Sequence, residues 1–384
     1  MPENKQDLKT KHERRFGKPD CEVWTPGRIN LIGEHTDYNN GYVLPAAIDS
    51  GISFLFSLNS DEEQFELYSA NLDQYESFRR EDGKLPPQNW AKYLQALIQL
   101  LREEDITVPG FSVSLSSSIP TGGGLSSSAA LNAGFILAIN KIGNHEWSIK
   151  KMARLAQYTE HRIGVRVGIM DPYAILAGKK NHFIKIDCRT NTYERIPADM
   201  KGHVLLLLDT GISHDLADSE YNERRQTCEN ILYAAQHFRD VKDVSALTDE
   251  DLVRIRSHYP DLSTAEVEYV LAENQRVIDV VGALTDGNMD EVGQLMYQSH
   301  AGLRDQYRVS CDELDFLVDQ AQSHAIPGAR MMGGGFGGST INLLPEIQLK
   351  SFVEEVTRAY YSQFGWQPTC LLVHPADGGR LGAY

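Results

Sequence analysis

A short segment near the N-terminus, residues 26–38, holds the densest group of side chains that could do chemistry. Arg28, Glu34, His35 and Asp37 fall within ten residues of one another, and two glycines in the segment indicate an irregular loop. Carboxylates beside a histidine could bind a metal, but the spacing is not that of a His-Glu-x-x-His site and no cysteine joins them. Buried acceptors beside an imidazole could instead bracket the hydroxyls of a sugar and discriminate between its epimers. A solvated polar loop is the third interpretation.

A glycine-rich loop, residues 122–128, forms the second candidate site. Consecutive glycines allow a sharp turn and bring backbone N–H groups close to a ligand, and the helix expected to follow adds the positive end of its dipole. The serines could cap that helix, donate to phosphate oxygens or supply a hydroxyl to Mg²⁺. The loop is not a Walker A motif, because no Gly-Lys-Ser/Thr follows, and a plain strand-to-helix turn is the alternative. The residues of this anion site are Gly122, Gly123, Gly124, Leu125, Ser126, Ser127 and Ser128.

A single carboxylate, Asp171, follows a short apolar stretch that begins at Gly168. A buried aspartate beside an arginine is a common way to hold a base in its ionised form. Pro172 comes next, and most Asp-Pro pairs simply begin turns, so this segment needs support from the other motifs.

Two further segments match short motifs of known sites, but the sequence around each lacks the other features that such a site needs. Residues 333–338 have the glycine spacing of a dinucleotide-binding loop, but a strand is predicted after them where that fold needs a helix. A glycine-rich hairpin that lets the backbone approach a ligand is the better interpretation. Residues 209–211 resemble half of an aspartic protease site, but the chain has no second Asp-Thr/Ser-Gly, which favours a strand end followed by a turn.

The elements that must position these residues are a mixture of strands and helices. Hydrophobic patterns predict strands at 22–24, 42–48, 52–58, 65–68, 111–115, 204–208 and 340–344. Helical spacing predicts helices at 90–102, 126–140 and 149–162, and long polar helices between 220 and 303. We therefore predict an α+β protein, without the regular alternation of strand and helix. The composition changes near 199–202, so we expect two domains, 1–200 and 201–384, with the last strand returning to the first domain.

The bulk composition excludes several classes of partner. The 384 residues include 37 basic and 53 acidic side chains, a formal net charge of −16. Such a surface repels phosphate backbones and anionic lipids, so we expect no nucleic acid and no membrane partner. Separately, we expect small-molecule substrates and a monomer. The five cysteines are widely spread, which argues against a disulfide framework or a zinc ribbon. No secretory signal and no membrane-spanning run is seen, so we expect a cytoplasmic location.

Three separated blocks of the chain resemble the GHMP kinase superfamily and, within it, the galactokinase family. These blocks are residues 27–38, 119–130 and 328–338, and residues 168–171 and 219–221 fit the same pattern in the expected order. The first block is the most specific, because other members of the superfamily do not share Gly-Glu-His-x-Asp-Tyr. The resemblance implies a two-domain GHMP kinase. Its N-terminal domain would resemble domain 2 of ribosomal protein S5, its C-terminal domain would be α/β, and the active site would lie in the cleft between them.

The resemblance also implies an activity and a role for each candidate residue. The implied reaction is phosphorylation of the C1 hydroxyl of α-D-galactose by ATP with Mg²⁺ as cofactor, and the glycine-rich loop would wrap the ATP phosphates. Asp171 would take or orient the hydroxyl proton, while Arg28 would keep Asp171 ionised and stabilise charge on the transferring phosphoryl group. Ser128 and Glu160 would hold Mg²⁺. The implied sugar-binding residues are Glu34, His35, Asp37, Gly168 and Tyr221.

Two other functions stay open on sequence alone. A kinase for N-acetylgalactosamine or another sugar would differ in the room around the C2 substituent of its substrate. A sensor that binds sugar and ATP without catalysis is the second, although the uninterrupted serine loop, Arg28 and Asp171 all favour an enzyme. The chain departs from the family pattern at Pro172, where glutamine is usual, and the stretch from Glu160 to Asp171 is one residue shorter.

Overall fold

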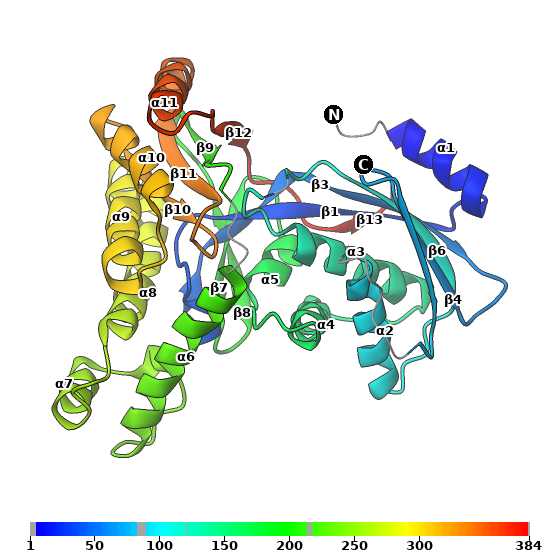
Figure 1. Cartoon of the computed structure of the whole chain (residues 1–384), viewed down its shortest axis with the longest axis horizontal. Helices are drawn as coiled ribbons and strands as arrows, with labels where there is room; N and C mark the ends of the chain where they lie inside the picture. Colours follow the sequence, from blue (N-terminus) through cyan, green and yellow to red (C-terminus); the bar gives the residue numbers. More distant parts are fainter. Residues whose placement is uncertain (1–4, 83–89, 121, 213–216, 383–384) are drawn as a thin grey trace.

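The protein is built from helices packed on three sheets, as a computed structural model shows (Figure 1). The structure describes residues 5–82, 90–120, 122–212 and 217–382. Strands and helices are mixed along the chain without regular alternation, which confirms the predicted α+β class. Within these ranges, no helix combines the length and the apolar composition that a membrane span requires.

A six-stranded sheet carries the N-terminal half of the chain, in the order β13-β1-β3-β6-β4-β5. Its strands are β1 (Cys21–Asn30), β3 (Pro45–Leu58), β4 (Gln64–Ser69), β5 (Gln74–Arg79), β6 (Phe111–Ser117) and β13 (Arg380–Leu381). Neighbours are antiparallel except for β4 and β6, which run parallel. The pairing of β13 with β1 brings the end of the chain back to the N-terminal sheet.

The two faces of this sheet pack differently, because successive side chains of a strand point to opposite faces. The covering helices are α2 (Lys92–Glu103), α3 (Ser127–Ile142), α4 (Ile149–Arg162) and α5 (Met170–Ala177) on one face and α1 (Lys5–Phe16) on the other (Figure 1). On the first face, Phe54 of β3 packs against Phe135 of α3. On the other face, Nδ1 of His12 lies 2.9 Å from the hydroxyl of Ser114, and Nε2 lies 2.9 Å from the hydroxyl of Ser57. Burial lowers the pKa of His12 to about 4, so the ring joins α1 to the sheet as a neutral group.

A second, four-stranded antiparallel sheet carries the C-terminal half, in the order β10-β11-β9-β12. Its strands are β9 (His203–Asp209), β10 (Gly328–Met332), β11 (Ser339–Pro345) and β12 (Thr369–Val373). The helices of this half are α6 (Ala217–Gln236), α7 (Asp249–His258), α8 (Ala265–Asp286), α9 (Met289–Gly302), α10 (Asp312–Ser323) and α11 (Leu349–Phe364). A small third sheet pairs β2 (Tyr42–Val43) with β7 (His182–Asp187) and β7 with β8 (Thr192–Pro197).

Two interpretations of glycine-containing segments are confirmed by the second sheet. Residues 333–338 join β10 to β11 as an antiparallel hairpin, so a strand follows the glycines and the dinucleotide-binding interpretation is excluded. Residues 209–211 are the end of β9 and the turn after it, where Gly211 has φ +73°.

The largest difference from the sequence prediction lies in the first two strands. The predicted strands at 42–48 and 52–58 are replaced by the short β2 and one long strand, β3. Strand β3 continues beside β1 through residues 48–50, which lie at a register shift between the pairs Pro26–Gly51 and Arg28–Ala47. Gly51 permits this close approach, because a Cβ there would lie 2.4 Å from the carbonyl oxygen of Thr25. Strand β1 consequently extends to Asn30, well into the segment predicted as loop.

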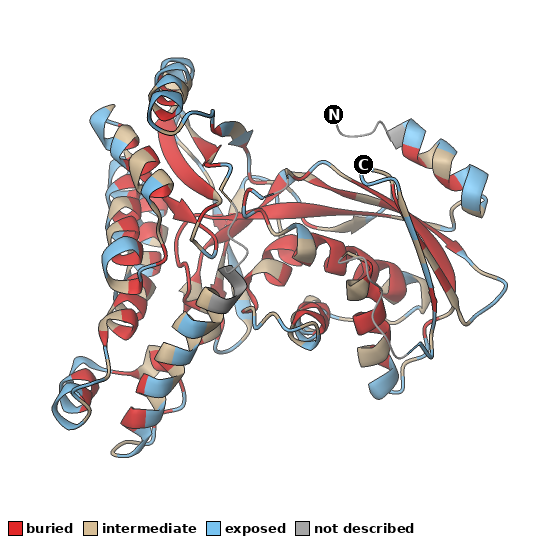
Figure 2. Ribbon diagram, in the orientation of Figure 1, coloured by how far each residue is buried: buried red, intermediate tan, exposed pale blue. Residues whose placement is uncertain are grey.

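One hydrophobic cluster extends across both large sheets. It contains Ile29 and Phe54 from the six-stranded sheet, Leu205 from β9 and Val277 from α8. Figure 2 shows the central strands β1 and β3 and helix α3 largely buried, whereas α1, α7 and α11 have exposed outer faces. The two halves therefore pack as one body, and the domain boundary near 199–202 stays a prediction.

Candidate active site

An ion pair between Arg28 and Asp171 joins the first strand to the first turn of α5. The Nε atom of Arg28 donates to Oδ1 of Asp171 at 2.7 Å, and Nη2 donates to Oδ2 at 3.0 Å. Burial opposes the charge of Arg28, but Asp171 and Glu34 outweigh it and raise the arginine pKa. Pro172 fits next to Asp171, because backbone nitrogens in the first turn of a helix need no intrahelical partner.

The glycine-rich loop lies directly against this pair. Gly122 and Gly124 have φ values of +86° and +69°, which glycine adopts without strain. Arg28 donates from Nη1 to the carbonyl oxygen of Gly124, and from its backbone nitrogen to that of Leu125 at 3.2 Å. Helix α3 begins at Ser127, so the loop has the strand before it and the helix after it that an anion site requires.

The glycine hairpin of the second sheet supports the loop from the other half of the molecule. The hydroxyl of Ser339 donates to the carbonyl oxygen of Gly123 at 2.9 Å. A Cβ added to Gly338 would lie 3.7 Å from the carbonyl oxygen of Gly122, so the two backbones nearly touch. The loop is therefore held between the N-terminal and C-terminal halves.

A cavity of about 190 Å³ opens beside the ion pair. Pockets for drug-sized ligands are larger, about 300–1,000 Å³, so this one suits a small molecule. Its lining residues are Arg28, Glu34, His35, Asp37, Val165, Val167, Gly168, Met170, Asp171, Tyr221, Gly333 and Gly334. The structure thus brings together the two residues predicted to be catalytic and the five predicted to bind sugar, although residues up to 193 positions apart in the chain supply them.

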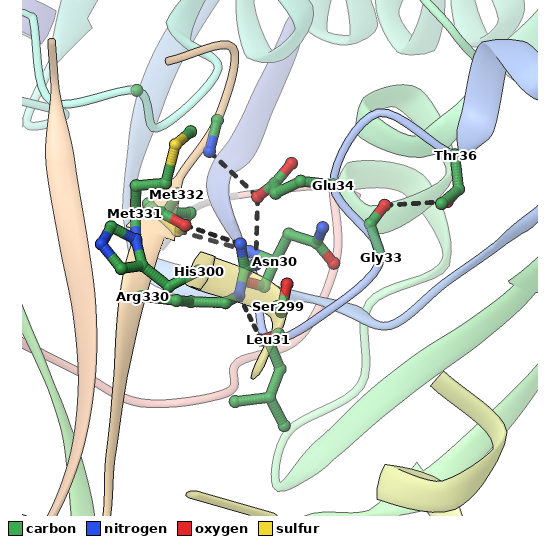
Figure 3. Close-up of polar contacts among 12 residues, drawn as sticks. Asn30, Leu31, Gly33, Glu34, Thr36, Ser299, His300, Arg330, Met331 and Met332 are labelled. Atoms are coloured by element: carbon green, nitrogen blue, oxygen red, sulfur yellow. Dashed lines mark hydrogen bonds and ion pairs between the residues drawn. The ribbon is translucent and has the colours of Figure 1, made fainter. Parts of the chain in front are cut away.

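Glu34 is held in this cavity by a buried arginine of the second sheet (Figure 3). Arg330 of β10 is fully buried and donates to Oε1 of Glu34 at 3.1 Å, while the backbone nitrogen of Gly333 donates to the same oxygen at 2.9 Å. Arg330 also donates to the carbonyl oxygens of Asn30 and Leu31. The second carboxylate oxygen of Glu34 points away from these donors, which leaves it able to accept from a ligand (Figure 3).

His35 lines the cavity and is fixed by a tyrosine behind it. Its backbone is left-handed, with φ +60°. Nδ1 lies 2.7 Å from the hydroxyl of Tyr38, which lies 2.9 Å from the hydroxyl of Tyr307. Nε2 is buried without a hydrogen-bond partner among the described residues. Burial lowers the pKa of His35 to about 3, against a smaller opposing effect of the Gly334 backbone, so the ring is neutral.

Asp37 lies between the backbone of Gly168 and the charge of Asp171. A Cβ at Gly168 would lie 1.7 Å from Oδ2 of Asp37, so only glycine leaves room for this carboxylate. Burial, followed by the charge of Asp171, raises the pKa of Asp37 to about 6.

Tyr221 of α6 adds a phenol to the cavity wall. Its ring centroid lies 5.4 Å from that of His35 and 5.1 Å from that of Tyr38. Burial raises the pKa of Tyr221 well above its ordinary value, so its hydroxyl stays protonated.

Neither predicted magnesium ligand lines the cavity. Ser128 is half-buried in the first turn of α3, and Glu160 is buried near the end of α4. In the part of the chain that the structure describes, no group of three or more His, Cys, Asp or Glu side chains could hold a metal alone. Ser128 and Glu160 each carry an oxygen donor, the ligand type that Mg²⁺ takes beside substrate phosphates and water.

Four residues take part in the site in ways that the sequence did not predict. Arg330 belongs to the third block that resembles the family, and Tyr38 ends the first block, but neither residue had an expected role from the sequence. Nothing in the sequence marked Tyr307. Ser126 was expected to serve a phosphate, whereas its hydroxyl donates to Oδ2 of Asp171.

Models of known protein families match three parts of the chain. Residues 10–58 match the galactokinase galactose-binding signature. Residues 92–179 match the GHMP kinases N terminal domain, and residues 280–363 match the GHMP kinases C terminal domain.

Curated proteins similar to the chain include galactokinases from bacteria and archaea. The galactokinase of Thermotoga neapolitana is 39% identical over 362 residues, which cover 93% of this chain and 98% of that protein. The galactokinase of Pyrococcus furiosus is 35% identical over 359 residues, which cover 93% of this chain and 98% of that protein.

Solved structures agree with these similarities. The crystal structure of Lactococcus lactis galactokinase complexed with galactose superposes with a TM-score of 0.92 at 31% identity, covering 98% of this chain and 99% of that one. The mevalonate kinase of Methanococcus jannaschii gives 0.65 at 20% identity, covering 93% of this chain and 98% of that one, a likeness that shows the fold alone.

Proposed function

The chain belongs to the galactokinase family of the GHMP kinases and is an ATP-dependent sugar kinase, and from this premise we propose how its active site works. The proposed reaction transfers the γ-phosphoryl group of ATP to the C1 hydroxyl of α-D-galactose, giving galactose 1-phosphate and ADP. One observation carries the proposal. The Arg28–Asp171 pair forms part of the wall of a small cavity and is also hydrogen-bonded to the glycine-rich loop. Sugar and phosphate donor would meet at this pair.

Asp171 is the proposed base and Arg28 its charged partner. Asp171 takes or orients the proton of the C1 hydroxyl. General-base help of this kind accelerates a reaction about 10²–10⁴-fold. Arg28 holds both oxygens of Asp171, and its guanidinium is close enough to the loop to stabilise charge that develops on the transferring phosphoryl group. Positioning and electrostatics supply most of the catalysis in such a reaction.

The remaining polar groups of the cavity are the proposed sugar ligands. Glu34 offers one unbound carboxylate oxygen, His35 offers Nε2, and Asp37 offers a carboxyl beside Gly168. Tyr221 closes the wall against the ring of His35. A hydroxyl of the wrong configuration would leave one of these buried groups unpaired, and such a loss discriminates strongly between epimers.

Residues 122–128 are the proposed binding loop for the ATP phosphates, through backbone N–H groups and the N-terminus of α3. Ser128 and Glu160 are the proposed protein ligands of Mg²⁺, which would neutralise phosphate charge when bound with ATP.

The first experiment is ADP release by the purified protein with Mg-ATP and a panel of hexoses. We expect turnover with galactose and loss of most of kcat in Asp171→Asn, with galactose binding retained because the fold and the other ligands are unchanged. Asp199→Asn, at an exposed aspartate paired with Lys201, is the matched control. Turnover of Asp171→Asn within a few-fold of wild type would remove Asp171 from its role.

The hexose panel also separates the alternatives. Preferred turnover of N-acetylgalactosamine or another sugar would change the proposed substrate. Binding of galactose and ATP without ADP release would indicate a sensor.

A further inference from the structure

Ser126 occupies an unusual position at the start of α3. As the N-cap residue it has φ 56° and ψ 49°, in the left-handed region, and its side chain makes no capping hydrogen bond. A capping serine normally has an extended backbone and accepts from an N–H of the first helical turn. A non-glycine residue held in the left-handed conformation is strained, and such strain is commonly kept where function needs it.

The hydroxyl of Ser126 turns instead to the active-site carboxylate. It donates to Oδ2 of Asp171, the oxygen that also accepts from Nη2 of Arg28 at 3.0 Å. Oδ1 of the same carboxylate accepts from Nε of Arg28 at 2.7 Å. Three donors thus fix both oxygens of Asp171, and one of these donors comes from the phosphate loop.

These contacts close a ring of hydrogen bonds between the loop and the ion pair. Arg28 donates to the carbonyl oxygen of Gly124 in the loop and also to Asp171. Asp171 in turn accepts from Ser126, which lies in the same loop two residues after Gly124. A displacement of the loop must therefore turn the carboxylate or break this ring. A hydroxyl carries one proton, so Ser126 cannot donate to Asp171 and to a phosphate oxygen at once.

We propose that Ser126 is a positioning residue for Asp171, which ties the orientation of the base to the placement of the phosphate loop. The inference rests on the proposed function of Asp171 as the base. A base must meet the proton that it takes within hydrogen-bond reach, and small misplacements slow a reaction strongly. Ser127, exposed, and Ser128, half-buried, remain available to phosphate and metal.

The test uses Ser126→Ala and Ser126→Gly in the galactose-dependent assay of the full-length protein. Both variants remove the hydroxyl, but alanine keeps the backbone strain at φ 56° whereas glycine relieves it. We expect kcat to fall about 10- to 100-fold in both variants, with the KM values for ATP and galactose within about twofold of wild type. Ser127→Ala, at the neighbouring exposed serine, is the comparison for a residue that acts on ATP, and its effect should fall on the KM for ATP.

Several outcomes would overturn the inference. A raised KM for ATP with kcat retained in Ser126→Ala would make Ser126 a phosphate ligand, and unchanged kinetics would leave it without a role. Recovery of kcat in Ser126→Gly would assign the effect to the backbone rather than the hydroxyl. Wild-type turnover and its loss in Asp171→Asn report on the proposed function separately, so a fully active Ser126→Ala beside an inactive Asp171→Asn rejects the positioning role alone.

Discussion

At the scale of single residues, the carboxyl of Asp37 in the cavity makes the stability of the folded protein depend on pH. Burial and the charge of Asp171 raise its pKa from 3.8 to about 6. The folded state therefore holds the Asp37 proton more tightly than the unfolded chain. The resulting stability is complete below about pH 4 and is lost as the pH rises through about 6.

We accordingly expect Asp37→Asn, which cannot ionise, to unfold at a higher temperature than wild type at neutral pH. The difference in Tm should be small near pH 4, grow up to about pH 6 and stay constant above, because wild-type Asp37 is then fully ionised. Thermal unfolding without sugar, followed from pH 4 to 8, measures this difference. A difference that does not change with pH would show that Asp37 does not titrate in this window.

A second prediction at this scale concerns the tyrosine behind His35. Tyr307→Phe removes the hydroxyl that pairs with Tyr38, which in turn contacts Nδ1 of His35. A lost hydrogen bond of this kind costs about 1 kcal/mol, so we expect the KM for galactose to rise about fivefold while the KM for ATP is unchanged. The control is Tyr297→Phe, because that hydroxyl donates to the carbonyl oxygen of Ile326 away from the cavity. Equal effects of both variants on the KM for galactose would disprove the connection.

At the scale of elements, α3 lies so close to the six-stranded sheet that a side chain at its glycine would clash with the sheet. A Cβ at Gly134 would lie 2.3 Å from the ring of Phe54. Gly282 is exposed and lies in α8 away from the ends of the helix, and a Cβ there would meet nothing within 4 Å. Helix propensity alone predicts that alanine stabilises both helices.

We expect opposite signs for the two alanine variants. Gly134→Ala should lower the free energy of unfolding by about 1–3 kcal/mol through overpacking, whereas Gly282→Ala should raise it by about 0.5–1 kcal/mol. Urea denaturation of the two variants measures both values. Stabilisation by Gly134→Ala would mean that α3 can move away from the sheet at little cost.

At the scale of the whole molecule, Arg330 joins the C-terminal sheet to residues 30–34 of the N-terminal half. Its guanidinium is fully buried, and the carboxylate of Glu34 is its partner at 3.1 Å. Removing one member of a buried ion pair leaves an unpaired charge in the interior and typically costs about 3–5 kcal/mol.

A double-mutant cycle tests this connection between the two halves. We expect Arg330→Met to lower the free energy of unfolding by about 3–5 kcal/mol, and the double variant with Glu34→Gln to lose clearly less than the sum of the single losses, because no unpaired charge remains. Equilibrium unfolding in urea provides all four values. Additivity within about 0.5 kcal/mol would show that the two residues are not coupled.

The sequence was sufficient for the fold class, the family and seven of the residues that line the cavity. The predicted α+β kinase fold is confirmed by the sheets, the family models and the galactokinase structure. Residues 27–38 could be recognised because their chemistry is concentrated within a few positions, and the glycine loop because it stands between a strand and a helix. The individual roles of these residues, the domain boundary and the magnesium ligands stay predictions.

Local patterns were less informative where pairing decided the structure. Residues 42–58 contain polar positions between two apolar runs, yet β3 continues through them because it pairs with β1 on both sides of a register shift. The sequence of β3 alone does not show that β1 will pair with it.

The sequence by itself thus determined which chemical groups this protein carries and in which order, since motifs of short spacing and hydrophobic periodicity are properties of neighbouring residues. Only the tertiary structure decided which group each of them meets. The hydroxyl of Ser126 binds Asp171, 45 residues away, and Glu34 meets Arg330 across 296 residues. The physical reason is that a buried polar group must find a partner, and the packing of whole sheets and helices, rather than the local sequence, determines which partner is within reach.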